Sequence, residues 1–329
     1  MSGLRAVARR GRLVMAGLVL AGACAGAPIA ADRATWIPPA STWLFTATQL
    51  LALAALATAW GTIRTQLGRV DLGHALYVGI GAYVAGAALG TLSWSPPAAV
   101  GFAALAASAV GTAAGVVARR LPAPAFALTT VALLVAGREL VRTATPLTRG
   151  PQGLALPPVV TPRALYEATL ATLLVTIIGA VVAARTRPGH PSAATPTRRR
   201  CMTVCALAGA ASGSVGALWA SQQLFIDADN AFSLARSFDV VWAALVGGPT
   251  IWGPMVGAGL LIGVREAWPV GAVTWRPLAE AAVVLLVALH LPAGVTRLRP
   301  GTKIRPPRSG ERPDQLAGPA AREKVADVD

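Results

Sequence analysis

Six ionisable side chains lie within or at the ends of strongly apolar segments: Asp71, Arg138, Glu139, Asp239, Glu266 and Glu280. A charged group in hydrocarbon is costly, so such residues are functional candidates by default. Structural roles compete with this interpretation. Arg138 can neutralise Glu139 and Arg265 can neutralise Glu266 near helix ends, whereas Asp71 and Asp239 can cap helix starts. Glu280 can pair with Arg276, four residues earlier. Asp71 and Glu139 remain as functional candidates.

The histidines and cysteines form no metal-binding pattern. Cys201 and Cys205 share a helical face, but no further cysteine or paired histidine lies nearby, so we expect buried thiols and no zinc site. We predict that the chain itself binds no metal and no other cofactor. His74 stands beside a glycine in an interrupted apolar segment. It is either a pore or hinge residue or a hydrogen-bonded packing residue.

The composition indicates a polytopic membrane protein. Of 329 residues, 54% are hydrophobic and 13% charged, and the mean hydropathy is +0.58. A soluble domain carries about 25% charged residues, so a soluble enzyme is unsupported, and disorder requires lower hydrophobicity. The net charge of +15 does not indicate nucleic acid, because the arginines cluster between apolar segments. We therefore predict an all-α transmembrane helix bundle.

Ten apolar segments approach the roughly 20 residues needed to cross a bilayer. They are 13–31, 41–62, 72–92, 97–118, 123–141, 164–184, 201–224, 237–247, 253–267 and 277–292. The pair 237–247 and 253–267 is short and broken at Gly247-Gly248-Pro249, so it forms either two spans with a tight turn or one crossing with a re-entrant piece. The expected total is about ten spans, within a range of eight to ten.

The distribution of basic residues sets the expected orientation. Most of the 29 lie on the cytosolic side if the N-terminus is inside, which predicts an even number of crossings with both termini inside the plasma (inner) membrane. The expected domains are a basic cytosolic N-terminus (1–12), a transmembrane domain (13–295) and a hydrophilic, disordered cytosolic tail (296–329). Segment 13–31 also resembles a cleavable signal peptide, which is the alternative to an uncleaved first helix.

Small residues recur at helical spacing along the chain. The pairs are Gly86/Gly90, Gly111/Gly115, Gly209/Gly213, Gly253/Gly257 and Gly259/Gly263. Helices in lipid associate through close contact at such residues, so the pairs predict a tightly packed bundle.

Two apolar stretches, 68–83 and 247–263, combine hydrophobicity with glycine or proline interruptions. Paired interruptions in two halves of a transporter indicate broken helices around a midplane site. Irregular backbone at membrane depth is tolerated only where protein or a water-filled cavity satisfies its polar groups.

Five motifs in these stretches and between them resemble the permeases of branched-chain amino-acid ABC importers, the LivM/LivH type. They are Gly73-His74 with Gly79–Tyr83, Phe126–Val131 with Arg138–Arg142, Pro146–Leu154, Ala206–Ala220 and Val246–Gly259. The motifs occur in order over residues 41–295, and the Pro146–Leu154 loop is similar to that of the LivM branch.

The resemblance implies a non-enzymatic membrane subunit of a binding-protein-dependent importer for branched-chain or related amino acids. Its partners would be the lipid bilayer, a homologous second permease, two cytosolic ATPases and an extracytoplasmic solute-binding protein, with no nucleic acid. ATP would be used only by those ATPases, since this chain has no Gly-rich phosphate loop. The expected substrate pathway comprises Gly73, His74, Gly79, Gly81, Tyr83, Phe126, Thr129, Thr130, Gly247, Gly248, Trp252 and Gly253.

The sequence departs from the family in the loop expected to dock on an ATPase. Residues 185–200 are short, contain three prolines and have no acidic residue, so a docking helix there is costly. The expected coupling residues are Arg185, Arg187, Arg198, Arg199 and Arg200. In addition, Asp71 stands where the family usually has serine, and Arg149 where glycine is common.

Two alternatives to an importer remain open. An ATP-independent carrier or channel would transport without nucleotide, and it usually has a more charged interior than this sequence shows. A degenerate, non-transporting membrane scaffold would retain the fold, and the shortened loop 185–200 would no longer bind an ATPase.

Overall fold

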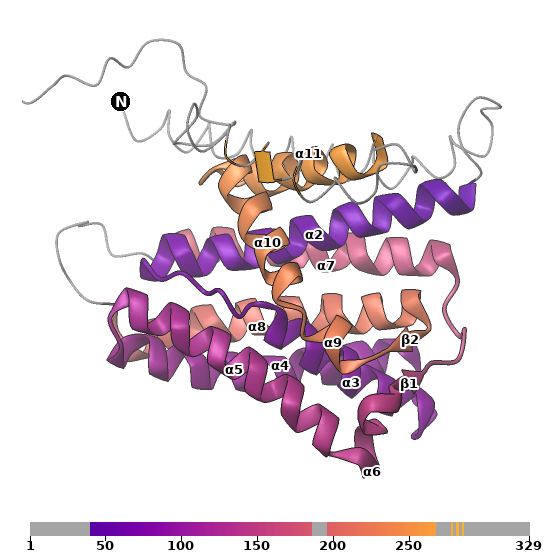
Figure 1. Ribbon diagram of the computed structural model, residues 1–329. Helices are drawn as coiled ribbons and strands as arrows, with labels where there is room; N and C mark the ends of the chain where they lie inside the picture. Colours follow the sequence, from indigo (N-terminus) through magenta and orange to yellow (C-terminus); the bar gives the residue numbers. More distant parts are fainter. Residues whose placement is uncertain (1–39, 186–195, 268–277, 279–280, 283–284, 286–329) are drawn as a thin grey trace, which may run out of the picture. The chain divides into compact units, whose positions relative to one another are not determined.

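The structure, a computed structural model, describes residues 40–185 and 196–267, together with residues 278, 281, 282 and 285. These residues are mostly helical (Figure 1). Segment 13–31, nearly all of 277–292, the N-terminus 1–12 and the tail 296–329 lie outside the described residues, so the predicted sides of the two termini stay predictions.

Eight longer helices account for most of the described chain. They are α2 (Ala40–Leu67), α3 (Ala75–Gly90), α4 (Pro96–Arg120), α5 (Ala123–Thr143), α7 (Pro162–Arg185), α8 (Arg198–Gln223), α10 (Leu234–Gly247) and α11 (Gly253–Ala267). The shorter elements are α6 (Thr145–Thr148), the 3-10 helix η1 (Gly150–Gln152), β1 (Leu154–Ala155), β2 (Phe225–Ile226) and α9 (Ala228–Ala231). Each of the eight apolar segments between 41 and 267 thus contains one of the longer helices, as expected.

Helix lengths separate complete spans from shorter pieces. Within the described residues, five helices are long and apolar enough to cross a membrane: α2, α4, α5, α7 and α8. Helix α3 is apolar but has only 16 residues, and α10 has 14. At about 1.5 Å per residue, α10 is about 21 Å long, less than the roughly 30 Å of a hydrocarbon core.

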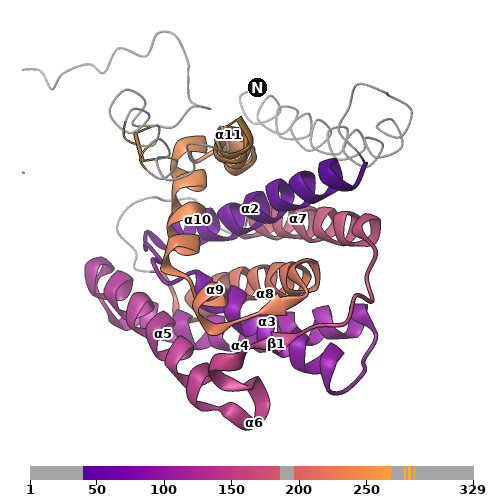
Figure 2. The same cartoon turned by 45° about the vertical axis from the view of Figure 1, so that its right-hand side comes forward.

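Glycine pairs bring α4 and α8 into close contact along their lengths (Figures 1 and 2). A Cβ added to Gly111 or Gly115 would clash with the backbone at Cys205 or Cys201, and one added to Gly209 would clash with the backbone at Ala107. Cys201 and Cys205 are buried, as predicted. Small residues therefore let the two backbones come into direct contact. Such close van der Waals packing is a main source of attraction between helices in lipid.

The other glycine pairs differ in what surrounds them. Gly257 packs against the backbone of α10 at Ala243, and Gly86 against the side chain of Ile226. Gly259 and Gly263 have no described atom within 4 Å of an added Cβ. The spacing alone did not distinguish packed glycines from open ones.

One feature departs from the all-α prediction. Strands β1 and β2 form an antiparallel pair in which Leu154 lies opposite Ile226, both of them buried. The pair joins the loop after η1 to the end of α8. Strands of two residues leave no periodic pattern in a sequence, so the expected bundle is correct in its helices but missed this link. Just before it, Arg149 adopts a φ of 55°, a conformation that suits the glycine usual there in the family it resembles.

The ionisable candidates form pairs, but not all in the expected way. Arg138 contacts Glu139 at 3.2 Å, as anticipated. Arg265, however, pairs with Asp239 at 2.6 Å and thus joins α11 to α10, while Glu266 accepts a hydrogen bond from Thr46 of α2. Tertiary packing of the α10–α11 hairpin decided this partner. Glu280 lies outside the described residues.

Candidate functional site

The first predicted interruption lies between α2 and α3. Helix α2 ends at Leu67, and residues 68–74 are not helical. Gly68 follows the helix at a φ of 65°, which a glycine adopts without steric cost. Asp71 and His74 in this segment are almost completely buried, with exposed fractions of 1% and 0%. The chain therefore carries an unwound, polar segment into its packed interior.

Three side chains form a hydrogen-bonded series across this segment. His74 Nδ1 lies 3.0 Å from Asp71 Oδ2, and His74 Nε2 lies 2.8 Å from the Ser212 hydroxyl of α8. A carboxylate only accepts hydrogen bonds, so Nδ1–H of His74 donates to Asp71, while Nε2 shares a hydrogen bond with the Ser212 hydroxyl. The other Asp71 oxygen accepts from the Gly73 amide at 3.0 Å. The histidine thus links the unwound segment to α8.

Other helices supply partners to four backbone groups of this segment and of the first residue of α3. The Thr130 hydroxyl of α5 accepts from the amides of Leu72 and Gly73 at 3.1 and 3.2 Å. The Ser237 hydroxyl of α10 accepts from the Ala75 amide at 3.0 Å, and Trp60 Nε1 of α2 donates to the Asp71 carbonyl at 2.6 Å. We call this set the clasp; its members are Trp60, Asp71, His74, Thr130, Ser212 and Ser237.

The depth of the clasp explains why so many side chains converge on it. Ser212 lies near the midpoint of the 26-residue helix α8, one of the candidate membrane spans. Unpaired amides and carbonyls at such depth would each cost several kcal/mol in hydrocarbon. Four surrounding helices, α2, α5, α8 and α10, therefore each supply one polar side chain.

The series Ser212–His74–Asp71 has the connectivity of a hydrolytic triad. Its surroundings do not support that chemistry. Ser212, like His74, has an exposed fraction of 0%, and the polar side-chain atoms of all three residues already have hydrogen-bond partners within the protein. No polar atom of the series is left to bind a substrate, so the arrangement fits a structural link. Of the two interpretations of His74, hydrogen-bonded packing matches these contacts.

The structure brings several of the predicted pathway residues together around the clasp. Gly73 packs directly on the backbone of Thr130, and Gly79 packs against the ring of Phe232. Tyr83 stacks on the same ring, with centroids 6.1 Å apart. The remaining three are placed individually: Gly81 packs on Gly213 of α8, Phe126 is buried, and Thr129 is half-buried with its hydroxyl bonded to its own helix.

The other four predicted residues lie elsewhere. Gly247, Gly248, Trp252 and Gly253 form the turn between α10 and α11. Ten residues of α10 separate Ser237 from Gly247, which corresponds to about 15 Å along the helix. The two interruptions thus occupy opposite ends of α10.

Sequence reasoning missed four residues of this region, Trp60, Ser212, Phe232 and Ser237. Ser212 and Ser237 are small polar residues in apolar helices, but so is Ser214, whose hydroxyl bonds to a carbonyl of its own helix. Local sequence alone could not distinguish Ser212 from Ser214.

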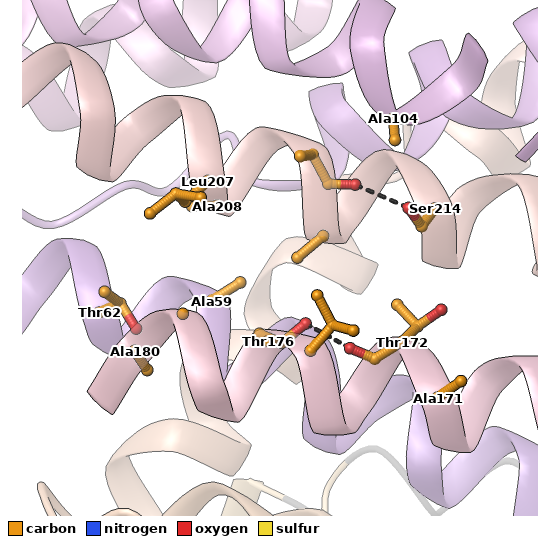
Figure 3. Close-up of a pocket in the computed structure, with 14 residues that line it drawn as sticks. Ala59, Thr62, Ala104, Ala171, Thr172, Thr176, Ala180, Leu207, Ala208 and Ser214 are labelled. Carbon is orange, nitrogen blue, oxygen red and sulfur yellow. Dashed lines mark hydrogen bonds between the residues drawn. The ribbon is translucent and has the colours of Figure 1, made fainter. Parts of the chain in front are cut away.

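A separate groove of about 340 Å³ lies among α2, α4, α7 and α8. Figure 3 shows Thr172 and Thr176 of α7 across from Leu207 and Ser214 of α8. The hydroxyls of Thr176 and Ser214 bond to carbonyls four residues earlier, so the groove presents an apolar surface. None of the predicted pathway residues lines it. A second cavity, of about 190 Å³, includes Gly248 beside Trp60 and Arg64.

The expected coupling arginines divide into two groups. Arg200 donates to Gln66 of α2 and to the Ala183 carbonyl of α7, so it ties three helix ends together. Arg185, Arg198 and Arg199 are exposed, and Arg198 lines a cavity of about 400 Å³ with Arg119 and Arg120 of α4. Arg187 lies outside the described residues.

The comparison with known protein families shows which family the chain belongs to. Residues 40–291 match the family described as the permease component of the branched-chain amino acid transport system. The chain belongs to this permease family. No curated protein sequence and no solved structure matches it. The match includes both interruptions and every helix described above, so this permease carries the clasp and the α10–α11 turn within its family region.

Proposed function

We propose that this permease is the transmembrane subunit of a binding-protein-dependent ABC importer. It moves branched-chain or related amino acids across the plasma membrane, with energy from separate ATPase subunits, and it belongs to the LivM branch. The family match over residues 40–291 is the observation that carries the proposal. The motifs of the Pro146–Leu154 loop support the assignment to the branch.

The arrangement of the helices supports a transport role. Unwound backbone at membrane depth occurs where it is buried in protein or lines a solute route. In this permease the unwound segment 68–74, buried at Asp71, Gly73 and His74, is hydrogen-bonded to four helices, so displacement of any one of them would act on α3. The clasp accordingly provides a route by which motion at one helix reaches the others.

The exposed arginines are the proposed contact for the ATPases. Arg185, Arg198 and Arg199 stand at the adjoining ends of α7 and α8, and Arg119 and Arg120 at the end of α4. Segment 185–200 contains no acidic residue, so this end offers only positive charge to an acidic partner surface. A homologous second permease and an extracytoplasmic solute-binding protein would complete the importer.

The test is to reconstitute the permease in proteoliposomes with a second permease, two ATPases and a solute-binding protein encoded beside it. We expect a stable complex whose ATP hydrolysis rises when binding protein and L-leucine, L-isoleucine or L-valine are added. A complex that assembles but responds to no amino acid would contradict the importer proposal.

Two other outcomes would identify the alternatives. The proline-rich loop 185–200 is the observation that favours a non-transporting scaffold, and failure to bind any ATPase while the subunit stays folded would support it. Uptake by the permease alone without ATP would indicate a carrier.

A further inference from the structure

Arg236 lies in an unusual environment for a charged side chain. In the first turn of α10, its guanidinium packs over the ring of Trp219 of α8, with the central carbon 3.8 Å from the centroid. One terminal nitrogen donates to the Asn230 carbonyl at 3.3 Å. The Nε–H is buried and has no hydrogen-bond partner among the residues that the structure describes. The described residues place no carboxylate oxygen within 4.0 Å of this guanidinium.

A second unsatisfied donor borders the same region. The Tyr83 hydroxyl of α3 is buried and has no partner. The Tyr83 ring stacks on Phe232, which lies four residues before Arg236. Tyr83, Phe232 and Trp219 belong to one apolar cluster. Among the described side chains, Tyr83 and Arg236 hold the only buried polar atoms without a partner, and both flank this cluster.

Unsatisfied donors of this kind are costly. A buried polar group without a hydrogen bond loses the solvation it had in water, and an unpaired buried charge loses more. Elsewhere in the described part of the chain every buried side-chain nitrogen and oxygen has a partner, and the clasp supplies partners to amides of the unwound segment. Two buried donors without a partner beside one aromatic cluster therefore indicate an acceptor that lies outside the described residues.

The chemistry of the two donors defines that acceptor. A guanidinium and a phenol hydroxyl both donate to a carboxylate, and the guanidinium favours an anion. The aromatic cluster beside them suits an apolar side chain. We propose that Arg236 and Tyr83 recognise the carboxylate of the transported amino acid, whose side chain packs against Trp219 and Phe232. This assignment rests on the proposed function as an amino-acid permease.

The experiment measures uptake of L-leucine by the complete importer in proteoliposomes, with Tyr83→Phe and Arg236→Gln in the permease. Tyr83→Phe removes only an unpartnered hydroxyl, so a purely structural role predicts unchanged or higher thermal stability and unchanged uptake. The proposal predicts that KM for L-leucine rises at least about tenfold in each variant, since a hydrogen bond to a charged group is lost. Arg236→Lys retains the charge and is expected to recover part of the loss.

Matched controls separate recognition from folding. Tyr166→Phe alters a buried tyrosine of a different cluster, and Arg163→Gln alters an exposed arginine paired with Glu167. Both are expected to keep KM within about twofold of the wild type. Thermal midpoints are measured for all variants, and only those that assemble at wild-type yield are compared.

The possible results have distinct meanings. An active wild-type importer whose Tyr83→Phe and Arg236→Gln variants keep the wild-type KM would overturn the carboxylate site and leave the proposed function intact. The carboxylate site is also overturned if Arg236→Gln alone fails to assemble while Tyr83→Phe keeps the wild-type KM. A wild-type complex that no amino acid stimulates would overturn the proposed function and the site with it.

Discussion

The two interruptions of this permease are held together in different ways. Before α3, the unwound segment is fastened by side chains of α2, α5, α8 and α10 through hydrogen bonds to Asp71, His74 and nearby amides. Between α10 and α11, glycines bring two backbones into contact. A Cβ on Gly247 would clash with Gly253, and one on Gly257 would clash with Ala243.

The difference shows which substitutions each region tolerates. The clasp consists of polar groups that compensate one another, so the loss of one partner leaves another unsatisfied in a buried place. The α10–α11 hairpin depends on the absence of side-chain volume, with Asp239 and Arg265 as an ion pair across it. Polar-to-apolar changes should therefore damage the first region, and added methyl groups the second.

The largest effect is expected for His74→Ala. It leaves Asp71 and Ser212 buried without their imidazole partner and opens a cavity, so we expect a loss of about 3 kcal/mol or more from the unsatisfied groups and the lost packing together. The free energy of unfolding of the purified subunit in detergent measures this. The control is Thr129→Ala in α5. The Thr129 hydroxyl bonds to the Ala125 carbonyl of its own helix, so we expect the free energy of unfolding to stay within about 0.5 kcal/mol of the wild type. If His74→Ala lowered the free energy of unfolding by less than about 1 kcal/mol, the clasp would not stabilise the unwound segment.

An intermediate effect with opposite signs is expected within α11. Gly257→Ala places a methyl group against the Ala243 carbonyl and should destabilise by about 1–3 kcal/mol. Gly259→Ala, in the same helix, meets no described atom within 4 Å and should stabilise by about 0.5–1 kcal/mol through helix propensity. Thermal unfolding of both variants tests the pair. Equal effects of the two would show that close backbone contact does not define the hairpin.

The smallest of these effects is expected for Ser212→Ala, which removes one hydrogen-bond partner of His74 and should cost about 1–2 kcal/mol. Its partner experiment is Ser214→Ala, two residues along α8, whose hydroxyl bonds to the Ala210 carbonyl of the same helix. The second change should leave stability within about 0.5 kcal/mol of the wild type. Chemical denaturation of both variants gives their free energies of unfolding, and the difference measures the contribution of the Ser212–His74 hydrogen bond. A larger loss of stability for Ser214→Ala than for Ser212→Ala would contradict the prediction.

Much of the helix pattern followed from the sequence because it depends on local properties. Runs of apolar residues bounded by arginine, proline or glycine defined the helices from 40 to 267, and Gly247-Gly248-Pro249 correctly marked an end of α10. The two-residue pairing of Leu154 with Ile226 was not predictable in this way, since residues 72 positions apart meet only through the fold.

The site was predictable in part for the same reason. Gly73, His74 and Thr130 were expected together, and they do meet. Ser237 of α10 and Phe232 just before that helix were missed because they lie far away in sequence, and nothing in their local pattern signals a partner. Gly247 and Gly253 were grouped with His74 by their similar character, but the length of α10 keeps the two sets apart.

The sequence by itself determined that this permease is a helical membrane protein with two interruptions, because hydrophobicity, glycine and proline act on the residues that carry them. Tertiary structure alone decided which groups meet. Hydrogen bonds and ion pairs act over about 3 Å, so the partners of His74, Arg265 and Thr130 depended on how whole helices pack. The same packing places the Tyr83 hydroxyl and the Arg236 Nε–H beside one aromatic cluster, where neither has a hydrogen-bond partner among the described residues.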